Sequence, residues 1–215
     1  MKPADRPHQQ SISGNPKDLA QELGFDGIMT LLGIICKAYK NLCVYEKVTS
    51  EMDEPEITEE LLIELKLIWK KTDLPLIPHH EKSDRKGKRR GRAPTIDFCF
   101  RDRWYKDSYF GAECKILEEK NNKLYNLYIE EGVGRYLSGK YGENCSAGSM
   151  IGYVKIGNTA EIINEVKVRV NTLPDSSEMR QADSIGKFTE HYKSVHERKV
   201  GRSPFHIHHL FFSFT

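Results

Sequence analysis

The chain has 215 residues, of which 38% are hydrophobic and 30% are charged, and its formal net charge is only +2. This length is typical of one domain, with or without a small appendage, and is enough to bury a sizeable core. The composition indicates a globular, rather polar protein, and the near balance of charge leaves the type of partner open.

The cysteines and the N-terminus exclude several protein classes. The five cysteines form no CxxC pair and are odd in number, which argues against a disulfide framework or a zinc site and favours buried thiols in a reducing compartment. Residues 1–15 are polar, unlike a signal peptide, and the longest apolar run, residues 28–36, is too short to cross a bilayer. We therefore expect a cytoplasmic protein that does not use a membrane.

The first third of the chain has the pattern of a loose arm followed by helices. Residues 1–16 are rich in Pro, Ser and Gln and predict a flexible arm. Apolar residues then recur at helical spacing over residues 17–47, with a break expected at Gly24. After an acidic link at residues 50–56, Thr58 has the properties of an N-cap for a helix that ends near Lys71. We divide the chain into an arm (1–16), a helical extension (17–56) and a main domain (57–215).

The main domain alternates strands and helices. Strands are expected at residues 74–80, 95–100 and 109–117, with a basic glycine-containing loop at 82–92 and a turn between the last two. A helix at 123–141, a strand at 147–156, a helix at 160–170 and a C-terminal β-hairpin (188–200 with 205–214) follow. Three strands in a meander and a helical crossover predict an α/β sandwich with a mixed central sheet.

Two neighbouring strands carry an unusual group of charged residues. Strand alternation leaves Asp97 on the face opposite three apolar neighbours, Ile96, Phe98 and Phe100. In the next strand Glu113 and Lys115 point the same way, while the core face takes Ala112, Cys114 and Ile116. A hairpin centred on Tyr105 places residue 97 opposite residue 113. Two carboxylates and an amine then meet on one face, although a plain salt bridge across a hairpin is the alternative interpretation.

This combination of side chains suits hydrolysis of a phosphodiester bond. Two carboxylates a strand spacing apart can hold a hard divalent cation such as Mg²⁺, which also keeps water and substrate phosphate as ligands. A lysine beside the cation can orient an attacking water or lower its pKa, and the cation offsets charge in the transition state.

A strand containing "ID", a hairpin and a strand containing "ECK", all preceded by an acidic helix, resemble the PD-(D/E)xK nuclease superfamily over about residues 58–157. The resemblance implies a three-layer αβα restriction-endonuclease-like core and a Mg²⁺ or Mn²⁺ cofactor. It implies that Asp97, Glu113 and the backbone carbonyl of Cys114 bind the metal and that Lys115 assists the nucleophilic water. Pro94 stands three residues before Asp97, so the literal "PD" of the family is missing.

The same family often adds an acidic residue from the helix before the sheet. On a helical wheel, Leu61, Leu65 and Ile68 define the buried arc, and Glu64 falls inside it. A carboxylate on a buried face needs a partner, and the metal would be one. We therefore predict Glu64 as a further catalytic and metal-binding residue, with Glu60 as the alternative.

The basic loop is the candidate nucleic-acid contact. Seven of its eleven residues are cationic, a density that favours binding to phosphates, although a solvated loop is the alternative. The helix at 123–141 resembles a helix of several bacterial defence and restriction nucleases, which makes Arg135 and Lys140 candidates for contacting the scissile phosphate or orienting Glu113. The cationic residues of the loop are Lys82, Arg85, Lys86, Lys88, Arg89, Arg90 and Arg92.

The histidines carry a weaker signal. His206 and His208 share one face of the last strand, as a pair of metal ligands would, but no third ligand with recognised spacing accompanies them. We expect structural or solvent-facing histidines there. His79 or His80 can reach the edge of the Asp97 site, because their strand neighbours that of Asp97.

These observations predict a metal-dependent nuclease that cuts DNA, and the resemblance adds a prokaryotic restriction or anti-phage role. The chain has no P-loop and no separate DNA-reading domain, so we expect a companion ATPase or helicase subunit, or a homodimer. Two alternatives stay open: a catalytically inactive subunit that binds nucleic acid or serves assembly, and an RNase, since nothing in the sequence separates DNA from RNA.

Overall fold

The computed structural model describes residues 18–83, 95–102 and 108–215. The predicted arm at residues 1–16 and the basic residues from Arg85 to Arg92 lie outside the described residues. Lys82 belongs to the first strand and not to a loop, and its side chain also lies outside the description.

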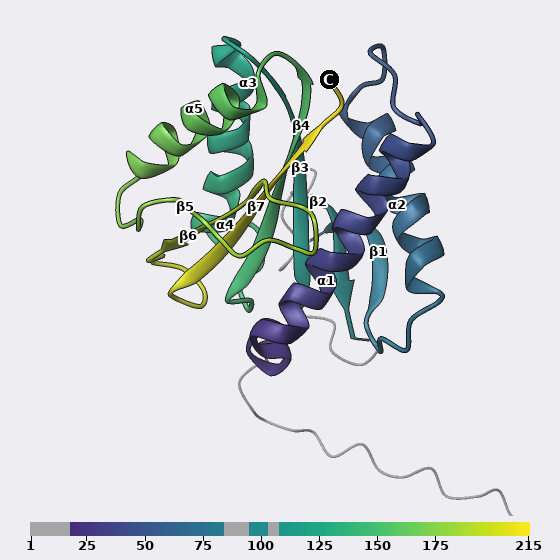
Figure 1. Ribbon diagram of the computed structural model, residues 1–215. Coiled ribbons are helices and arrows are strands. Elements are labelled where there is room, and N and C mark those ends of the chain that lie inside the picture. The colour runs from purple at the N-terminus through teal and green to yellow at the C-terminus, as the bar shows by residue number, and fades with distance from the viewer. Residues whose placement is uncertain (1–17, 84–94, 103–107) are drawn as a thin grey trace, which may run out of the picture.

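A seven-stranded mixed sheet forms the centre of the molecule (Figure 1), which confirms the predicted α/β class. Strands β1, β2 and β3 form the predicted antiparallel meander, β3, β4 and β7 run parallel, and β6 and β5 pair antiparallel beyond them. The spatial order is β1 (Ile77–Ser83), β2 (Thr95–Arg101), β3 (Phe110–Glu118), β4 (Ala147–Ile156), β7 (Phe205–Ser213), β6 (His191–His196) and β5 (Arg180–Gln181).

The first strand begins three residues later than the sequence pattern predicts. Leu76 is buried in the core, but ladder pairing starts at Ile77, opposite Arg101. Pro78 lies within the strand, and proline is tolerated in edge strands such as β1 because one side of the strand has no neighbour to bond.

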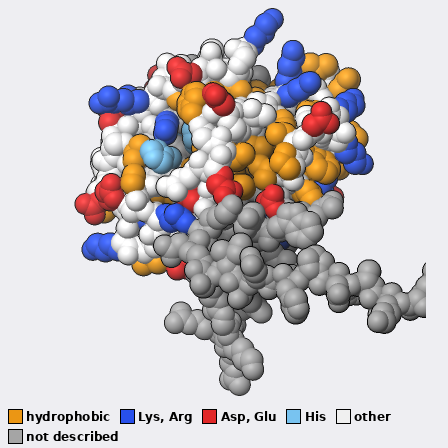
Figure 2. Space-filling view, turned by 90° about the horizontal axis from the view of Figure 1, so that it is seen from below, with side chains coloured by type: hydrophobic (Ala, Val, Ile, Leu, Met, Phe, Trp, Pro, Cys, Tyr) orange, Lys and Arg blue, Asp and Glu red, His pale blue; other side chains and the backbone are white. Residues whose placement is uncertain are grey.

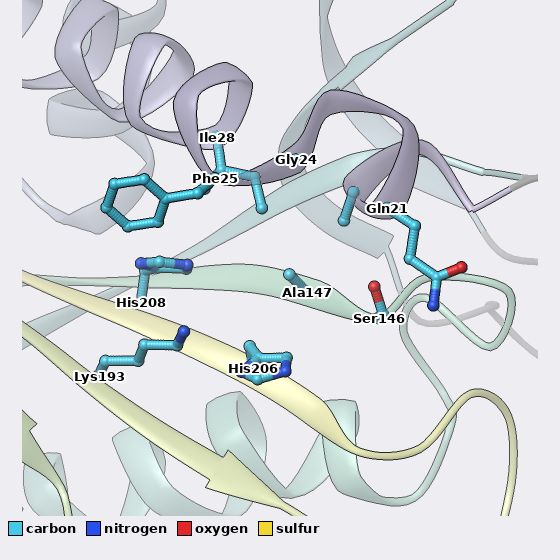
Figure 3. A pocket seen from close by; sticks show the side chains of 10 residues that line it. Gln21, Gly24, Phe25, Ile28, Ser146, Ala147, Lys193, His206 and His208 are labelled. Carbon is cyan, nitrogen blue, oxygen red and sulfur yellow. The ribbon is translucent and has the colours of Figure 1, made fainter.

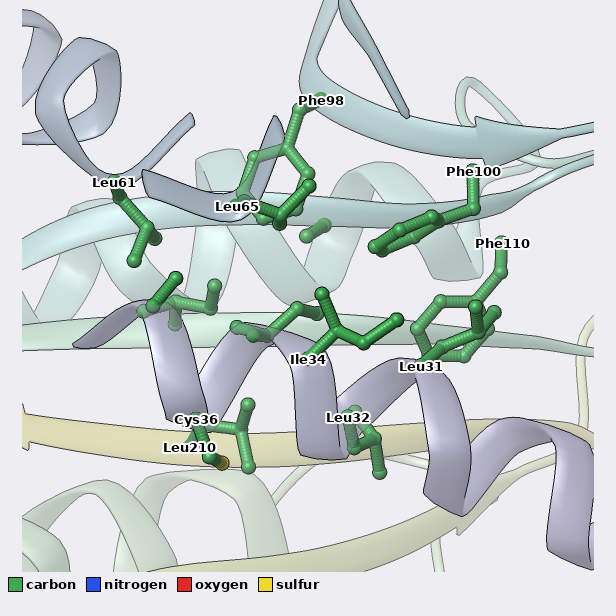
Figure 4. Close-up of a cluster of buried hydrophobic side chains, with 14 of the residues drawn as sticks. Leu31, Leu32, Ile34, Cys36, Leu61, Leu65, Phe98, Phe100, Phe110 and Leu210 are labelled. Atoms are coloured by element: carbon green, nitrogen blue, oxygen red, sulfur yellow. The ribbon is translucent and has the colours of Figure 1, made fainter. Parts of the chain in front are cut away.

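Helices α1 (Leu19–Val44) and α2 (Glu54–Trp69) cover one face of the sheet (Figure 1). Gly24 breaks α1 as predicted, with φ 62° and ψ −170°. The core under these helices joins apolar side chains of α1 and α2 to aromatic side chains of β2 and β3 (Figure 4), among them Leu31, Leu32, Leu61, Leu65, Phe98, Phe100 and Phe110.

Helix α1 is part of the main domain. Its buried residues belong to the same hydrophobic cluster as α2 and the sheet, and the proposed boundary at residue 56 falls inside α2. The predicted separate extension over residues 17–56 therefore does not match the packing. Among the described helices, only α1 is also long and apolar enough to cross a membrane by length and composition, and here its apolar side packs into the core.

Helix α2 begins one turn before the predicted N-cap at Thr58. Asp53 is the N-cap: its side chain accepts a hydrogen bond from the backbone N–H of Glu56, and the Glu56 side chain accepts one from the backbone N–H of Asp53. This reciprocal capping box satisfies two donors at the helix start. The Thr58 hydroxyl instead donates to the Glu54 carbonyl within the helix.

The other face of the sheet is covered by a crossover and by α5 (Thr159–Asn171). The helix predicted over residues 123–141 is present but irregular and shorter, and it consists of α3 (Asn122–Asn126), a π-helical segment η1 (Leu127–Val133) and α4 (Gly134–Leu137). Gly132 lies against Met150 of β4, where an added Cβ would come within 2.3 Å of the Met150 Cε atom. The absence of a side chain at Gly132 thus permits close packing of this segment onto the sheet.

The C-terminal hairpin lies inside the sheet and is not an appendage. Strands β6 and β7 pair antiparallel as predicted, and β7 also pairs in parallel with β4 along eight residue pairs. Because β7 is flanked by two strands and covered on both faces, its apolar residues Phe205, Ile207, Leu210, Phe211 and Phe212 are all buried.

Candidate active site

The candidate site lies where strands β2 and β3 separate. Their hydrogen-bonded pairing ends at Phe98 opposite Ala112, although both strands continue beyond this point. Extending the same register by one residue places Asp97 opposite Glu113, as predicted. Just beyond the last pair, the backbone N–H of Cys114 donates to Oδ2 of Asp97 at 2.7 Å. The carboxylate of Asp97 therefore occupies the gap in place of a neighbouring backbone carbonyl.

Strict alternation fails at the start of β2. Phe98 and Phe100 pack under α1 and α2 as predicted, but Ile96 packs in the cluster on the opposite face, with Tyr109. The Ile96 side chain occupies the space above Gly111, where an added Cβ would lie 2.4 Å from its Cδ1 atom. Ala112 and Cys114 lie on the predicted core side.

Glu113 and Lys115 are brought together next to Asp97. The ammonium group of Lys115 lies 3.0 Å from Oε1 of Glu113 and donates to the carbonyl of Cys114 at 2.6 Å. The Glu113 side chain is only 2% exposed, and its second oxygen, Oε2, is buried with no hydrogen-bond partner among the described residues. A buried carboxylate oxygen without a partner is costly, and it marks a place where a ligand can bind.

Glu54, which the sequence interpretation missed, completes the cluster from the first turn of α2. Its Oε1 accepts a hydrogen bond from Lys115 at 2.8 Å, and its Oε2 accepts the backbone N–H of Ile116 at 3.1 Å. That N–H is available because β2 no longer pairs with β3 at this level. The capping box of Asp53 and Glu56 is the sequence signal that could have found it, since it starts the helix one turn earlier.

Glu64 does not join this cluster, so the prediction that it completes the site is wrong for this structure. Its Oε2 accepts from the Asn41 amide and its Oε1 from the Lys47 ammonium, both at 2.8 Å. Glu64 lies ten residues after Glu54, about 15 Å farther along the helix axis. The alternative, Glu60, faces the same lysine at 3.6 Å.

Burial and mutual repulsion disturb the ionisation of both central carboxyl groups. Burial, together with the charge of Asp97, raises the pKa of Glu113 to about 7. Burial also raises the pKa of Asp97, against the lowering effect of Lys115. For Lys115 burial alone would lower the pKa, but the carboxylates of Glu113, Glu54 and Asp97 outweigh it and the pKa is raised. The lysine is therefore a cation at neutral pH, and the carboxyl groups favour additional positive charge.

The donor set fits a hard divalent cation. Among the described residues, no three His, Cys, Asp or Glu side chains form a ready-made ligand group. Two carboxylates and one backbone carbonyl are nevertheless oxygen donors of the type that Mg²⁺ takes, with water and substrate supplying the remainder. The Lys115 ammonium already contacts Glu113 and the Cys114 carbonyl, two of the three groups assigned to the metal by the family resemblance.

Only some of the remaining predicted residues lie beside the site. Arg135 lies beside the site, with Nη1 3.7 Å from Oε1 of Glu113 and bonded to the Tyr141 hydroxyl at 2.7 Å, and it pairs with Glu131. Lys140 is exposed. His80 is on β1 opposite Phe98, close enough for its charge to lower the pKa of Asp97.

The C-terminal histidines take part in hydrogen bonds within the hairpin and between the hairpin and η1. Nδ1 of His209 bonds the Tyr128 hydroxyl at 2.9 Å and its Nε2 bonds Ser194 at 2.8 Å. His208 bonds His191 at 3.0 Å. His208 and His209 are buried and His206 is partly exposed, which agrees with the expectation of structural or solvent-facing positions for His206 and His208.

The site described above is therefore built by four elements: β2 supplies Asp97, β3 supplies Glu113 and Lys115, α2 supplies Glu54 and α4 supplies Arg135. No protein-family model, curated protein or solved structure matches the chain. Any functional assignment therefore depends on the residues and their geometry.

Proposed function

We propose that this protein is a metal-dependent nuclease that hydrolyses phosphodiester bonds in DNA with Mg²⁺ or Mn²⁺. The observation that supports this most strongly is the convergence of Asp97, Glu113 and Lys115 in the gap between β2 and β3, with one buried oxygen of Glu113 unpartnered. A salt bridge serving only stability would pair both oxygens, whereas this arrangement keeps a carboxylate oxygen for a ligand.

In this proposal the cation is held by Asp97, Glu113 and the carbonyl of Cys114. Bound there, it would supply Lewis acidity and a water of lowered pKa next to the phosphate. Lys115 acts as a permanent hydrogen-bond donor and positive charge, because its pKa is raised, and not as a general base. Glu54 is a positioning residue that fixes the Lys115 ammonium and the start of α2 against β3.

The biological setting follows from the family resemblance. Helices on both faces of a mixed sheet suit the three-layer αβα core of restriction-endonuclease-like enzymes, and we propose that fold for this chain. A role in prokaryotic restriction or anti-phage defence in the cytoplasm, with a companion ATPase or helicase or as a homodimer, belongs to the same proposal. Arg135, Lys140 and the basic segment at 82–92 are the proposed nucleic-acid contacts.

A plasmid-cleavage assay tests the proposal directly. Purified protein is incubated with supercoiled plasmid and Mg²⁺ or Mn²⁺, in parallel with a structured RNA to separate DNase from RNase activity. We expect nicking or cutting of DNA by the wild type, and none by Asp97→Ala, Glu113→Ala or Lys115→Ala. The matched control is Lys120→Ala, which removes a lysine on the same segment whose side chain is 88% exposed. Equal activity in all five proteins would contradict the proposal.

One observation favours a second candidate, a catalytically inactive subunit that binds nucleic acid. The Lys115 ammonium contacts Glu54, Glu113 and the Cys114 carbonyl, so the positive charge of the lysine already neutralises part of the cluster. In this case the purified protein would bind DNA with a steep salt dependence but cut nothing, even with candidate partner subunits added.

A further inference from the structure

A pocket lies on the α1 side of the sheet, where α1 is broken. Gly24 interrupts the helix, and the short segment before it and the long segment after it leave a cavity of about 230 Å³ against β4, β6 and β7. Figure 3 shows Gln21, Phe25 and Ile28 on the helix side facing Lys193, His206 and His208 on the strands. An added Cβ at Gly24 would meet no atom within 4 Å, so the break itself is open.

This pocket combines a free cation with exposed apolar surface. Lys193 makes no ion pair with any carboxylate in the described part of the chain, and the residues that line the cavity include neither Asp nor Glu. Phe25 at the rim is 59% exposed, so its ring adds apolar surface beside the cation. In the view from below, histidine side chains reach the surface beside a Lys or Arg side chain (Figure 2).

An aromatic ring held in water beside a cation offers a stacking surface to a ligand that carries both a charge and an apolar part. The ring of Phe25 and the side chain of Ile28 provide this surface above Lys193.

The hydrogen-bond network fixes the proton of His208. Nδ1 of His191 bonds the Asp183 carbonyl at 2.8 Å, and because a carbonyl only accepts, this nitrogen carries the proton. In a neutral His191, Nε2 then accepts from Nδ1 of His208, at 3.0 Å. His208 therefore carries its proton on Nδ1, and its Nε2 is an acceptor with no partner among the described residues.

His206 adds a second unsatisfied group. Its Nδ1 is buried and has no hydrogen-bond partner within the described structure, although the residue lines the pocket. Because Nδ1 is shielded, an anion in the pocket would meet the other ring nitrogen, Nε2, which carries the proton of a neutral imidazole when Nδ1 does not.

From these features we infer that the pocket binds a small phosphate monoester. Lys193 and Nε2 of His206 would donate to phosphate oxygens, and Nε2 of His208 would accept from a protonated oxygen or a neighbouring hydroxyl. The apolar part of the ligand would pack against Phe25. A transition metal is the poorer occupant, because Lys193 would repel it and no carboxylate offsets its charge.

This inference does not depend on the proposed nuclease activity. His208 packs near Phe110 on the α1 side of the sheet, whereas Glu113 contacts Arg135 on the opposite side. The two sites can therefore be tested separately, and chelation of divalent metal removes any contribution from the site in the β2–β3 gap.

Calorimetric titration of the full chain in EDTA tests the inference, with phenyl phosphate, inorganic phosphate and benzoate as probes. We expect saturable one-site binding of phenyl phosphate that is tighter than binding of inorganic phosphate, because only the former covers Phe25. Lys193→Gln should weaken phenyl phosphate binding about tenfold or more, since it removes a charge-assisted hydrogen bond. Phe25→Ser should weaken phenyl phosphate but leave inorganic phosphate unchanged.

Lys187→Gln is the matched control, because it removes the same charge from an exposed position outside the pocket and should bind like the wild type. Circular dichroism establishes that each variant is folded. Three results would overturn the inference: no saturable binding of phenyl phosphate, equal binding by Lys193→Gln, or benzoate binding as tightly as phenyl phosphate. Zn²⁺ binding that is lost in His206→Ala would assign the pocket to a metal and would also overturn it.

Discussion

Two buried glutamates, Glu64 and Glu113, show how differently one side chain type is used in this fold. Both oxygens of Glu64 are hydrogen-bonded, one to Asn41 and one to Lys47, and these partners lower its pKa. Glu113 has one oxygen near Lys115 and one with no partner in the described structure, and its pKa is raised to about 7. Glu64 is therefore one member of a structural ion pair, whereas the unpartnered oxygen of Glu113 favours the binding of a further cation.

Burial of a carboxylate alone therefore does not identify a ligand-binding site. Both side chains are nearly inaccessible, with exposures of 7% for Glu64 and 2% for Glu113. What separates them is whether the surrounding donors satisfy the carboxylate. Substitutions at and around the two carboxylates test this distinction.

The largest effect should be on catalysis. Asp97→Asn should lower the rate of plasmid nicking by at least about 100-fold, because an amide is a weak ligand for a hard cation. Glu64→Gln should nick at close to the wild-type rate, since Glu64 lies about 15 Å from Glu54 along α2. Rates are measured well below the unfolding temperature of each variant. Loss of activity in both variants would contradict the assignment of Glu64 to a structural ion pair outside the site.

The next effect concerns stability without metal. In the folded state the pKa of Glu113 is raised from 4.5 to about 7. The resulting contribution to stability is therefore fully present below pH 4.5 and is lost as the pH rises through about 7. Glu113→Gln keeps the neutral form at every pH. In EDTA at pH 8 it should be more stable than the wild type by about 1–3 kcal/mol, with little difference at pH 4.5. Denaturant unfolding across this pH range measures the difference, and a stability loss at pH 8 would contradict the account.

Glu64 should show the opposite pH dependence. Its lowered pKa means that the charged form stabilises the fold above the usual glutamate range and that this contribution is lost as pH falls below it. Glu64→Gln should therefore cost about 1 kcal/mol at pH 7, a modest value because Lys47 is partly exposed and screened by water. The cost should disappear at low pH in the same unfolding experiment. A cost that persists there would mean that packing, not charge, holds Glu64.

The smallest effect belongs to Arg135. Its guanidinium lies 3.7 Å from Glu113 and helps to lower the pKa of that carboxyl group. Arg135→Gln should therefore raise the pH at which metal binding is half-maximal by a few tenths of a unit. Thermal-shift titrations with Mn²⁺ at several pH values measure this change. A downward shift would show that Arg135 acts on the site in some other way.

Much of the fold follows from local sequence patterns. The strand at residues 147–156 and the break at Gly24 are predicted correctly, because strand composition and glycine punctuation are local signals. The placement of the C-terminal hairpin is not predictable in this way. Strand β7 inserts beside β4, which is a pairing between distant segments that periodicity does not encode.

The candidate site was predictable where it depends on strand register and not where it depends on a helix start. The hairpin centre at Tyr105 gives the observed register of β2 and β3, and hence the meeting of Asp97 with Glu113. The helical contribution was assigned to Glu64 from the buried arc of α2 alone. A position on a buried arc does not show which neighbour the side chain meets, and here the neighbour of Glu64 is α1.

The most direct test of the central claim is a Mn²⁺ titration followed by electron paramagnetic resonance, with the wild type, Glu113→Gln and Glu64→Gln compared at pH 8. The account predicts one Mn²⁺ site that is present in the wild type and in Glu64→Gln and is lost in Glu113→Gln. Equal Mn²⁺ binding by the wild type and Glu113→Gln, or no binding by the wild type, would contradict it.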